Sequence, residues 1–359
     1  MIDSQNSNAK NSEPVRAIRV VNPLVDSNWD AKIGVLPGVS IFHTVSWART
    51  LQETYGFRPI YFVYEESGKI QGLLPIMEVD SWLRGRRAVG LPFTDECAPL
   101  TTESGSLRLL CDAALGMAEK HSWKYLEVRG GQAIFGETPA STLFFGHRLD
   151  LSIGEAALLS QISKSARGAI KKAEKSDLTI EFSRKIEAVQ VFYNLLCLTR
   201  KRHGVPPQPF SFFTKIHEHI LEKELGWLIL ARHRGVPVAG GVFFHFGRAA
   251  MHKFGASDEK FQSLSANNLV LWEAIKWYAS HHYAYLDLGR TSADNAGLRK
   301  FKMAWGTVER SITYFRYDVR TSAVVSVPDA ASGWHNHIFR LMPISASKAV
   351  GALLYKHVA

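Results

Sequence analysis

Two cations in the second half of the chain, Arg290 and Lys302, are of the types that bind a phosphate or stabilise a developing oxyanion. An adjacent pair of carboxylates, Asp95 and Glu96, can orient an amine or accept its proton, although turn residues of this kind need no function. His203 can act as a base near neutral pH, or it can simply stabilise the end of a helix. These residue types suit a reaction in which negative charge develops beside an amine, and the alternative is a solvated basic surface.

The elements that must position Arg290 and Lys302 are predicted from the segment Ser265 to Gly306. Apolar residues at helical spacing predict a helix from Asn267 to about His281. Residues 283–288 are then typical of a strand, which runs into a turn that carries Arg290 and a second helix that carries Lys302. Because open α/β sheets bind ligands at the carboxyl ends of their strands, we expect a ligand near this turn.

The loop over residues 255–268 leads from a strand into the predicted helix at Asn267. Small residues before a helix start leave the first backbone amides accessible, and such amides can bind a pyrophosphate. Any loop that caps a helix has a similar composition, so an ordinary helix cap is the alternative. The loop is a candidate binding site for a phosphorylated donor.

The composition is that of a globular protein, with 46% hydrophobic and 21% charged residues among 359. That length suggests two domains. The net charge of +10 suggests an anionic partner, such as a nucleic acid, a phosphorylated ligand or an acidic membrane face. Three widely spaced cysteines argue against a disulfide framework and favour a reducing cytoplasm. Residues 1–14 are expected to be disordered and lack the apolar core of a signal peptide.

Common catalytic motifs are missing from the sequence. It contains no nucleophile elbow, no HExxH pair, no paired CxxC and no Walker phosphate loop. Several classes of hydrolase, metalloenzyme and nucleotide hydrolase are therefore excluded, and no metal is expected. A mixed sheet with anion-binding features at its edges remains.

An internal repeat is the main clue to the architecture. Shifting the chain by 160 positions superposes residues 109–128 on residues 269–288 without a gap. An earlier hairpin, residues 61–76, recurs in the same order at residues 228–244 once a single inserted glycine is allowed. The repeat predicts two copies of one α/β unit, joined near residue 150.

Two further segments are cationic. In the second copy, Lys164, Arg167 and Lys171 fall on one face of a predicted helix over residues 163–175. The tail from Trp334 to His357 alternates apolar and basic residues, which is typical of a packed terminal helix or of a helix at a membrane surface.

The order of these motifs resembles that of the FemAB-like branch of the GNAT acyltransferase superfamily, and of BioF2-like acetyltransferases in particular. In the second half the resemblance rests on "SKSARGAIKKAEK", "RHGVPPQPFSFF", "GVPVAGGVFFHFG", "KFGAS", "NNLVLWEAIKW", "YLDLGRT" and "LRKFKMAWG". In the first half it rests on "FHTVSWARTL" and "LPFTDECAPL". The tail motif "RLMPISASKAVGALL" resembles FemAB-like proteins encoded with exopolysaccharide and exosortase systems.

This resemblance implies transfer of an acyl or aminoacyl group to an amine, with donor and acceptor bound together. The family's Phe-Lys motif falls on Phe301-Lys302, Arg290 takes the DLGR position, and Asp95 takes the acidic position of the first-unit loop. In the family a backbone amide stabilises the tetrahedral oxygen where two central strands separate, which here implies residues 251–256.

The coenzyme A signature of the superfamily is present only in a degenerate form at residues 262–267, without its glycines. A long helical hairpin, frequent in members that use aminoacyl-tRNA, is replaced by the short basic helix. Both an acyl-CoA and an aminoacyl-tRNA therefore stay open as donors. The residues expected to bind the donor are Gln262, Ser265, Asn267 and Asn268, and those expected to bind substrate are Lys164, Arg167, Lys171 and Phe301.

The predicted fold class is α/β (α+β), with tandem GNAT-like units whose sheets are mixed and largely antiparallel. Residues 1–14 are predicted to be disordered. The first unit is predicted to span residues 15–150, the second unit residues 151–325, and a helical tail residues 326–359. The predicted function is transfer of an acyl group, from a thioester or a tRNA ester, to an amine of a cell-envelope or polysaccharide precursor, in the cytoplasm or at the inner face of the membrane. The predicted catalytic residues are Lys302, Arg290, Asp95 and His203.

The alternative function is a non-catalytic module that binds nucleic acid or an anionic membrane on a degenerate GNAT scaffold. The two hypotheses differ in where the charges lie. Convergence of Asp95, Arg290 and Lys302 in one cleft favours an enzyme, whereas charges spread over an outer face favour a binding module.

Overall fold

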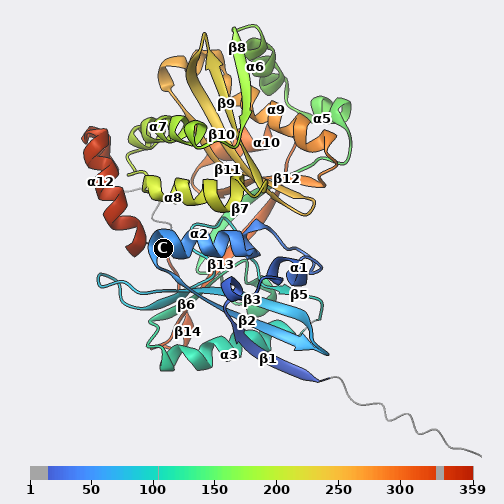
Figure 1. The fold of residues 1–359 in the computed structure, drawn as a ribbon, viewed down its shortest axis with the longest axis vertical. Coiled ribbons are helices and arrows are strands. Elements are labelled where there is room, and N and C mark those ends of the chain that lie inside the picture. Colours follow the sequence, from blue (N-terminus) through green and yellow to red (C-terminus); the bar gives the residue numbers. More distant parts are fainter. Residues whose placement is uncertain (1–14, 104, 329–334, 359) are drawn as a thin grey trace, which may run out of the picture.

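The structure, a computed structural model, describes residues 15–103, 105–328 and 335–358. Its described residues form one mixed sheet of 14 strands, flanked by helices (Figure 1). Twelve strands follow the order β1-β2-β3-β4-β6-β13-β7-β12-β11-β10-β9-β8, while β5 pairs with β3 and β14 with β13. This sheet confirms the predicted fold class.

The strands span the following residues: β1 (Arg16–Val21), β2 (Arg58–Glu66), β3 (Lys69–Val79), β4 (Arg87–Val89), β5 (Leu100–Thr101), β6 (Tyr125–Arg129), β7 (Thr142–Asp150), β8 (Leu178–Ser183), β9 (Gly226–His233), β10 (Val236–Phe246), β11 (Ala249–Ser257), β12 (Tyr285–Ser292), β13 (Val308–Asp318) and β14 (Ala323–Val324). The helices are α1 (Trp29–Ile33), α2 (Val45–Tyr55), α3 (Ser106–Lys120), α4 (Gln132–Phe135), α5 (Glu155–Gln161), α6 (Lys164–Glu174), α7 (Ile186–His203), α8 (Phe210–Ile216), α9 (Ala266–Ser280), α10 (Ala296–Met303), α11 (His335–Leu341) and α12 (Ile344–Leu354). Short helical turns are η1 (Pro23–Val25), η2 (Ile41–His43), η3 (His217–Leu221), η4 (Glu259–Leu264) and η5 (Tyr355–His357).

The internal repeat of the sequence is visible in the order of the elements. The β2–β3 hairpin, α3 and β6 in the first half have counterparts in the β9–β10 hairpin, α9 and β12 in the second half. Helices α3 and α9 each contain 15 residues and begin 160 positions apart. In each half a strand that precedes this helix runs parallel to the strand that follows it, β4 to β6 and β11 to β12. The domain limits given above stay a prediction.

The two halves are joined by an exchange of strands that the sequence did not predict. Strand β7, the last strand of the first half, pairs with β12 of the second half. Strand β13, near the end of the second half, pairs with β6 of the first half. Because β7 and β13 also pair with each other, the sheet is continuous from one half to the other.

Among the described residues, three large hydrophobic cores hold the helices on this sheet. One lies under α3 in the first half and another under α5, α6 and α9 in the second half. The largest lies between the halves, where α2 and α8 are stacked (Figure 1). There Trp47 of α2 packs edge-on against Phe212 of α8 and close to Phe244 of β10. Burial of large aromatic side chains from both halves fixes how the halves lie together.

The described part of the chain departs from the sequence-based expectations at β12, which continues to Ser292 instead of ending before Gly289. Gly289 adopts a positive φ of 73°, and the pairing with β7 shifts at this point, so the expected turn is a bulge within the strand. Residues 1–14 and Trp334 lie outside the described residues. None of the helices in the described ranges has the length and apolar character needed to cross a membrane.

Candidate active site

The parallel strands β11 and β12 diverge in the middle of the second half. They are paired from Ala249 and Tyr285 only as far as Met251 and Asp287. Beyond that point β11 bulges against β10, with Lys253 as the extra residue between two paired positions. Beyond this point the backbone groups of β11 and β12 no longer pair with each other. We call the space between the diverging strands the strand opening, and bulged strands of this kind are often found next to ligand sites.

Asp95, from the first half, bridges this opening. Its Oδ2 accepts a hydrogen bond from Nζ of Lys253 on β11 at 2.8 Å. On the β12 side, its carboxylate lies within 3.6 Å of the position that a Cβ on Gly289 would occupy. A Cβ at this distance would make ordinary van der Waals contact with the carboxylate, so it is the positive φ of Gly289 that favours glycine there.

The loop that carries Asp95 is held at both ends. The Tyr314 hydroxyl of β13 donates to the carbonyl of Asp95 at 2.6 Å. His43 of η2 is buried, and its Nε2 lies 2.9 Å from the carbonyl of Ala98. Tyr314 lies on β13, which reaches the first half only through the strand exchange. The position of Asp95 therefore depends on that exchange.

Lys302 and Arg290 lie on the β12 side of the opening. The Lys302 side chain is buried, and Nζ donates to the carbonyls of Gly289 at 2.8 Å and Arg290 at 3.1 Å. An ammonium has three donors, so one remains for a ligand. The Arg290 guanidinium lies over the ring of Phe144, 4.1 Å from its centre. Both cations therefore have fixed positions beside Asp95.

The titration of the cluster reflects this crowding. Burial opposes ionisation of Asp95, but the cations of Lys253, Arg290 and Lys302 outweigh it and hold the pKa of its carboxyl below the ordinary value. Burial lowers the pKa of Lys302 to about 8, although Asp95 and Asp287 oppose the shift. Burial, aided by Lys302, lowers the pKa of His252 on β11 to about 4, so that this imidazole is neutral at pH 7. The opening carries excess positive charge, which suits a developing oxyanion.

A pocket of about 360 Å³ lies at the N-terminus of α9. Ser265 precedes the helix in a left-handed conformation (φ 56°) and makes no side-chain cap. The first amides of a helix have no acceptor within the helix, so they can bind an anion here. All four residues expected to bind the donor line this pocket, together with Phe301 of α10: Gln262, Ser265, Asn267 and Asn268.

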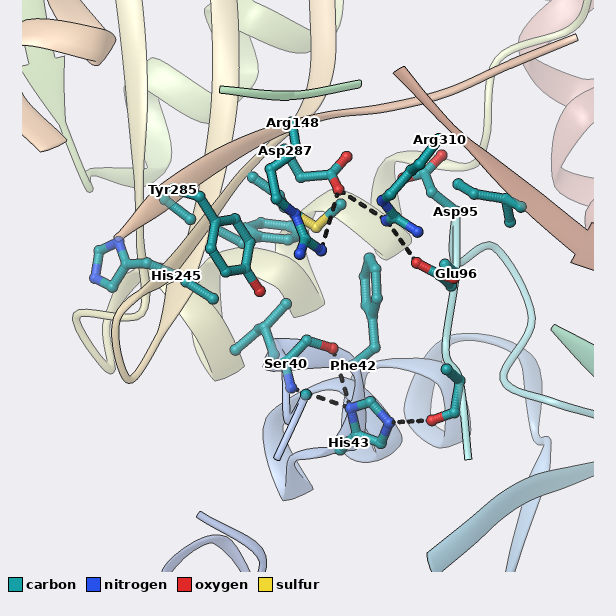
Figure 2. A pocket seen from close by; sticks show the side chains of 18 residues that line it. Ser40, Phe42, His43, Asp95, Glu96, Arg148, His245, Tyr285, Asp287 and Arg310 are labelled. Atoms are coloured by element: carbon teal, nitrogen blue, oxygen red, sulfur yellow. Dashed lines mark hydrogen bonds and ion pairs between the residues drawn. The ribbon is translucent and has the colours of Figure 1, made fainter. Parts of the chain in front are cut away.

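A second cavity, of about 80 Å³, lies between the halves and is shown in Figure 2. Its wall includes Asp95, Met251 and Asp287, so it reaches the point where β11 and β12 diverge. Arg310 joins two carboxylates, with contacts of 2.6 Å to Glu96 and 3.0 Å to Asp287. These side chains form a charged wall with both signs of charge (Figure 2).

Arg148 also lies in this wall, and it makes weaker contacts with carboxylates than Arg310 does. Its guanidinium lies over the ring of Tyr285 at 3.9 Å and is 3.8 Å from Asp287. Its side chain is 41% exposed. A guanidinium held in place by an aromatic ring, with donors to spare, can bind a carboxylate or a phosphate.

Comparison with known proteins identifies the second half. Residues 160–303 match the family described as "Acetyltransferase (GNAT) domain". This part of the chain is therefore similar to a GNAT acetyltransferase domain. This match confirms the superfamily and the enzyme class predicted from the motifs, an N-acyltransferase. No curated protein shows significant sequence similarity to the chain.

Solved structures with a similar fold extend beyond the GNAT domain. FemX matches with a TM-score of 0.64 at 16% identity, over 79% of this chain and 94% of FemX. The C-terminal domain of a putative lysylphosphatidylglycerol synthetase from Agrobacterium fabrum matches with a TM-score of 0.54 at 14% identity, over 80% of this chain and 89% of that domain. A tandem GNAT protein from the clavulanic acid pathway matches with a TM-score of 0.53 at 12% identity, over 88% of this chain and all of that protein. At these identities the likeness is one of fold.

Within this GNAT fold, several predicted site residues lie apart from the strand opening. His203 ends α7, where burial and the cations Arg202, Arg200 and Arg340 lower its pKa. Lys164 and Lys171 lie exposed on α6. The Arg167 side chain donates to the carbonyls of Leu159 and Ser160 at the end of α5. The structure does not bring these four residues to either pocket: His203, Lys164, Arg167 and Lys171.

The sequence reasoning missed Lys253, Arg148, Asp287 and Arg310. Lys253 lies within the strand implied by the GNAT resemblance, but its role depends on a bulge that only the pairing with β10 reveals. Arg148 and Arg310 lie on the exchanged strands β7 and β13. Asp287 was visible in the repeat as the counterpart of Glu127, which is the one signal that was available.

One further cluster has the composition of a metal site. Glu53, Glu218 and His219 bring their ligand atoms within 4.8 Å of one another. However, Nζ of Lys215 lies 2.7 Å from both carboxylates and already provides a cation. The cluster therefore serves as an ion-pair network between α2 and the α8 region.

Proposed function

We propose that this protein transfers an acyl group from an acyl-CoA thioester to a primary amine of a cell-envelope or polysaccharide precursor. The donor pyrophosphate binds at the N-terminus of α9, and the acceptor amine enters from the cavity between the halves. The observation that carries this proposal is the divergence of β11 and β12 with Asp95, Arg290 and Lys302 gathered around it. Convergent charges of this kind favour an enzyme over a binding module.

The length of the path between the pockets supports a long donor. Strand β11 leads from Met251, which lines the interface cavity, to Ser257, which lines the pocket at α9. Six residues of strand span about 20 Å. An extended arm such as that of CoA covers this distance between its phosphates and its thioester, whereas a small acyl phosphate does not.

The reaction needs no covalent enzyme intermediate. The neutral amine attacks the thioester carbonyl, a C–N bond forms, and the carbonyl oxygen becomes an oxyanion. Backbone amides of the β11 bulge and the nearby Lys302 and Arg290 cations stabilise this charge. The C–S bond then breaks, and the proton lost by the amine ends on the CoA thiol, so atoms and charge balance. Asp95 orients the amine, because its ionised carboxylate accepts hydrogen bonds.

A titration of the purified protein with possible donors tests the proposal. Acetyl-CoA, longer acyl-CoAs and a charged tRNA are added separately, and the melting temperature is followed. A donor at about 100 times its Kd stabilises the folded state by about 2.7 kcal/mol. We expect acyl-CoAs to raise the melting temperature and to yield an acylated amine, detected as a mass increase on a panel of amino sugars and amino acids.

Two results would overturn this choice of donor or of function. Stabilisation and turnover by charged tRNA alone would make the protein an aminoacyltransferase. Salt-sensitive binding of nucleic acid without turnover of any donor would support the non-catalytic alternative.

A further inference from the structure

The C-terminal end of the described chain is fastened to the turn between β3 and β4. Nδ1 of His357 lies 2.9 Å from the hydroxyl of Ser81. The backbone carbonyl of His357 accepts a hydrogen bond from the Arg87 side chain at 2.9 Å. The imidazole also packs edge-on against the ring of Trp82, with 5.4 Å between the ring centres. The turn and the tail therefore form one surface, although they are far apart in the sequence.

Large apolar side chains project from this surface. Trp82 is 83% exposed and Leu83 is 54% exposed at the tip of the turn. From the tail, Val358 is 44% exposed, and Leu353, one helical turn before His357, is 66% exposed. An exposed large apolar side chain is common singly, but an exposed tryptophan adjoining other apolar residues marks an interaction site.

Cations surround these apolar residues. Arg84 and Arg86 in the turn and Lys356 in the tail are all exposed. The carboxylate of Asp80 pairs with Arg86 at 3.0 Å, which leaves the positive charges in excess. We call these residues the tryptophan patch: Trp82, Leu83, Arg84, Leu353, Lys356 and Val358.

We propose that the tryptophan patch docks the protein on a membrane surface that contains anionic lipids. Tryptophan and leucine at the tip of a turn can enter the interface between headgroups and acyl chains, where an indole ring is favoured. Each exposed lysine or arginine beside them gains from the negative surface potential of such a membrane. Two signals that are weak singly, apolar insertion and charge attraction, together give stable attachment.

This surface is separate from the reaction proposed above. Neither the interface cavity nor the pocket at α9 is lined by a residue of the tryptophan patch. Failure of one proposal therefore leaves the other intact. Docking would also explain why a protein with no membrane-crossing helix among its described residues combines an exposed tryptophan with a net charge of +10.

Co-sedimentation of the full chain with lipid vesicles tests the proposal. Vesicles of phosphatidylcholine alone are compared with vesicles that contain about 30% phosphatidylglycerol, which supply the negative potential. We expect binding to the anionic vesicles, a loss of binding in about 0.5 M NaCl, and an affinity about tenfold lower for Trp82→Ser/Leu83→Ser. Arg84→Glu/Lys356→Glu should weaken binding to the anionic vesicles by a similar factor.

Matched variants separate the patch from general effects. Val35→Ser removes an apolar side chain that is 80% exposed elsewhere, and Arg234→Glu reverses a cation that is 76% exposed on the β9–β10 turn. Both controls should bind like the original protein, and all variants should keep the same melting temperature. Equal binding by the Trp82→Ser/Leu83→Ser variant, or no binding of the original protein to anionic vesicles, would overturn the proposal. So would a loss of self-association in that variant without any vesicle binding, because the patch would then join copies of this chain.

Discussion

The β4–β6 pair of the first half and the β11–β12 pair of the second half diverge after equivalent residues, but different groups fill the space beyond. Glu127 ends the first pairing and Asp287 ends the second, and the two lie 160 positions apart. Two positions later the first half has Arg129 and the second half has Gly289. The buried Arg129 donates to the carbonyls of Leu91 and Thr94, and so seals its own opening. Gly289 has no side chain, which leaves room for Asp95.

The N-termini of α3 and α9 also differ, because the first is filled by a side chain and the second faces a pocket. In α3 the side chain of Ser106 is buried and bonded to the hydroxyl of Thr101 at 2.6 Å. The corresponding end of α9 faces the pocket lined by Ser265 and Asn268. The two halves therefore share a scaffold but differ at this helix N-terminus, where the second half carries the proposed donor site. The first half has instead become a support that presents the Asp95 loop to the second.

The largest effect is expected when Lys302 is removed from the open half. Lys302→Ala deletes a buried cation beside the proposed oxyanion, so kcat/KM should fall by about a thousandfold. Steady-state kinetics measures this fall, and the melting temperature checks the fold. Lys300→Ala, on the exposed face of the same helix, is the control and should keep full activity. Unchanged turnover by the Lys302→Ala variant would contradict the assignment of Lys302 as a catalytic residue.

Asp95→Asn should lower kcat by about a hundredfold, because the carboxylate that orients the amine is lost. Binding of the donor should persist and can be followed by thermal stabilisation. Asp112→Asn, on the exposed face of α3, removes a carboxylate from the same half without touching the opening. If Asp95→Asn kept its kcat, the loop would be a structural support and nothing more.

The two openings should also differ in their response to pH. Burial opposes the charge of Arg129, but Tyr314 and Glu127 raise its pKa, so the first opening stays charged at any accessible pH. In the second, the folded state holds the proton of Lys302 less tightly than the unfolded state, with a pKa of about 8 against 10.5. Unfolding therefore takes up a proton between these values, and stability rises with pH there.

Urea unfolding of the original protein and of Lys302→Met at pH 7 to 10 measures this difference. The cost of the buried cation is fully present below pH 8. We therefore expect the stability of the original protein to gain about 2 kcal/mol relative to Lys302→Met as the pH rises above 8. Lys300→Met should show no such trend. A constant difference across this range would mean that Lys302 keeps an ordinary pKa.

The smallest expected effect tests the helix N-termini. Asn268→Asp places a carboxylate at the start of α9, where it should weaken donor binding about tenfold by repelling the pyrophosphate. Arg108→Asp places the same charge at the equivalent position of α3, 160 residues earlier, and should leave donor binding unchanged. Equal effects of the two substitutions, measured by titration with acetyl-CoA, would contradict the contrast between the halves.

Much of the scaffold was predictable because local patterns determine it. The amphipathic period gave α9 to within a residue or two, and the repeat gave the order of elements. Family motifs singled out Asp95, Arg290 and Lys302, but they left open whether these residues converge, because Asp95 is remote in sequence. The residues of the loop before α9 also line a common pocket, as expected.

The parts that were not predictable depend on partners that a local pattern does not name. The bulge at Lys253 arises from pairing with β10, and the places of Arg148 and Arg310 arise from the exchange of β7 and β13. His203 has a suitable side chain, but helical periodicity does not reveal which neighbours surround the end of α7. Arg200, Arg202 and Arg340 surround it instead of the reacting groups.

The exchange of β7 and β13 also constrains how this protein is made. Tyr314 on β13 holds the Asp95 loop, and Arg310 on the same strand joins Glu96 to Asp287. The ribosome must therefore release residue 318 before the proposed reaction centre can assemble, even though its other residues emerge earlier. Until β13 is synthesised, the edge of β6 in the first half is unpaired, and such an edge can pair with strands of other chains. Truncation before β13 should remove the centre and expose that edge together, so that loss of activity and aggregation arise from one event.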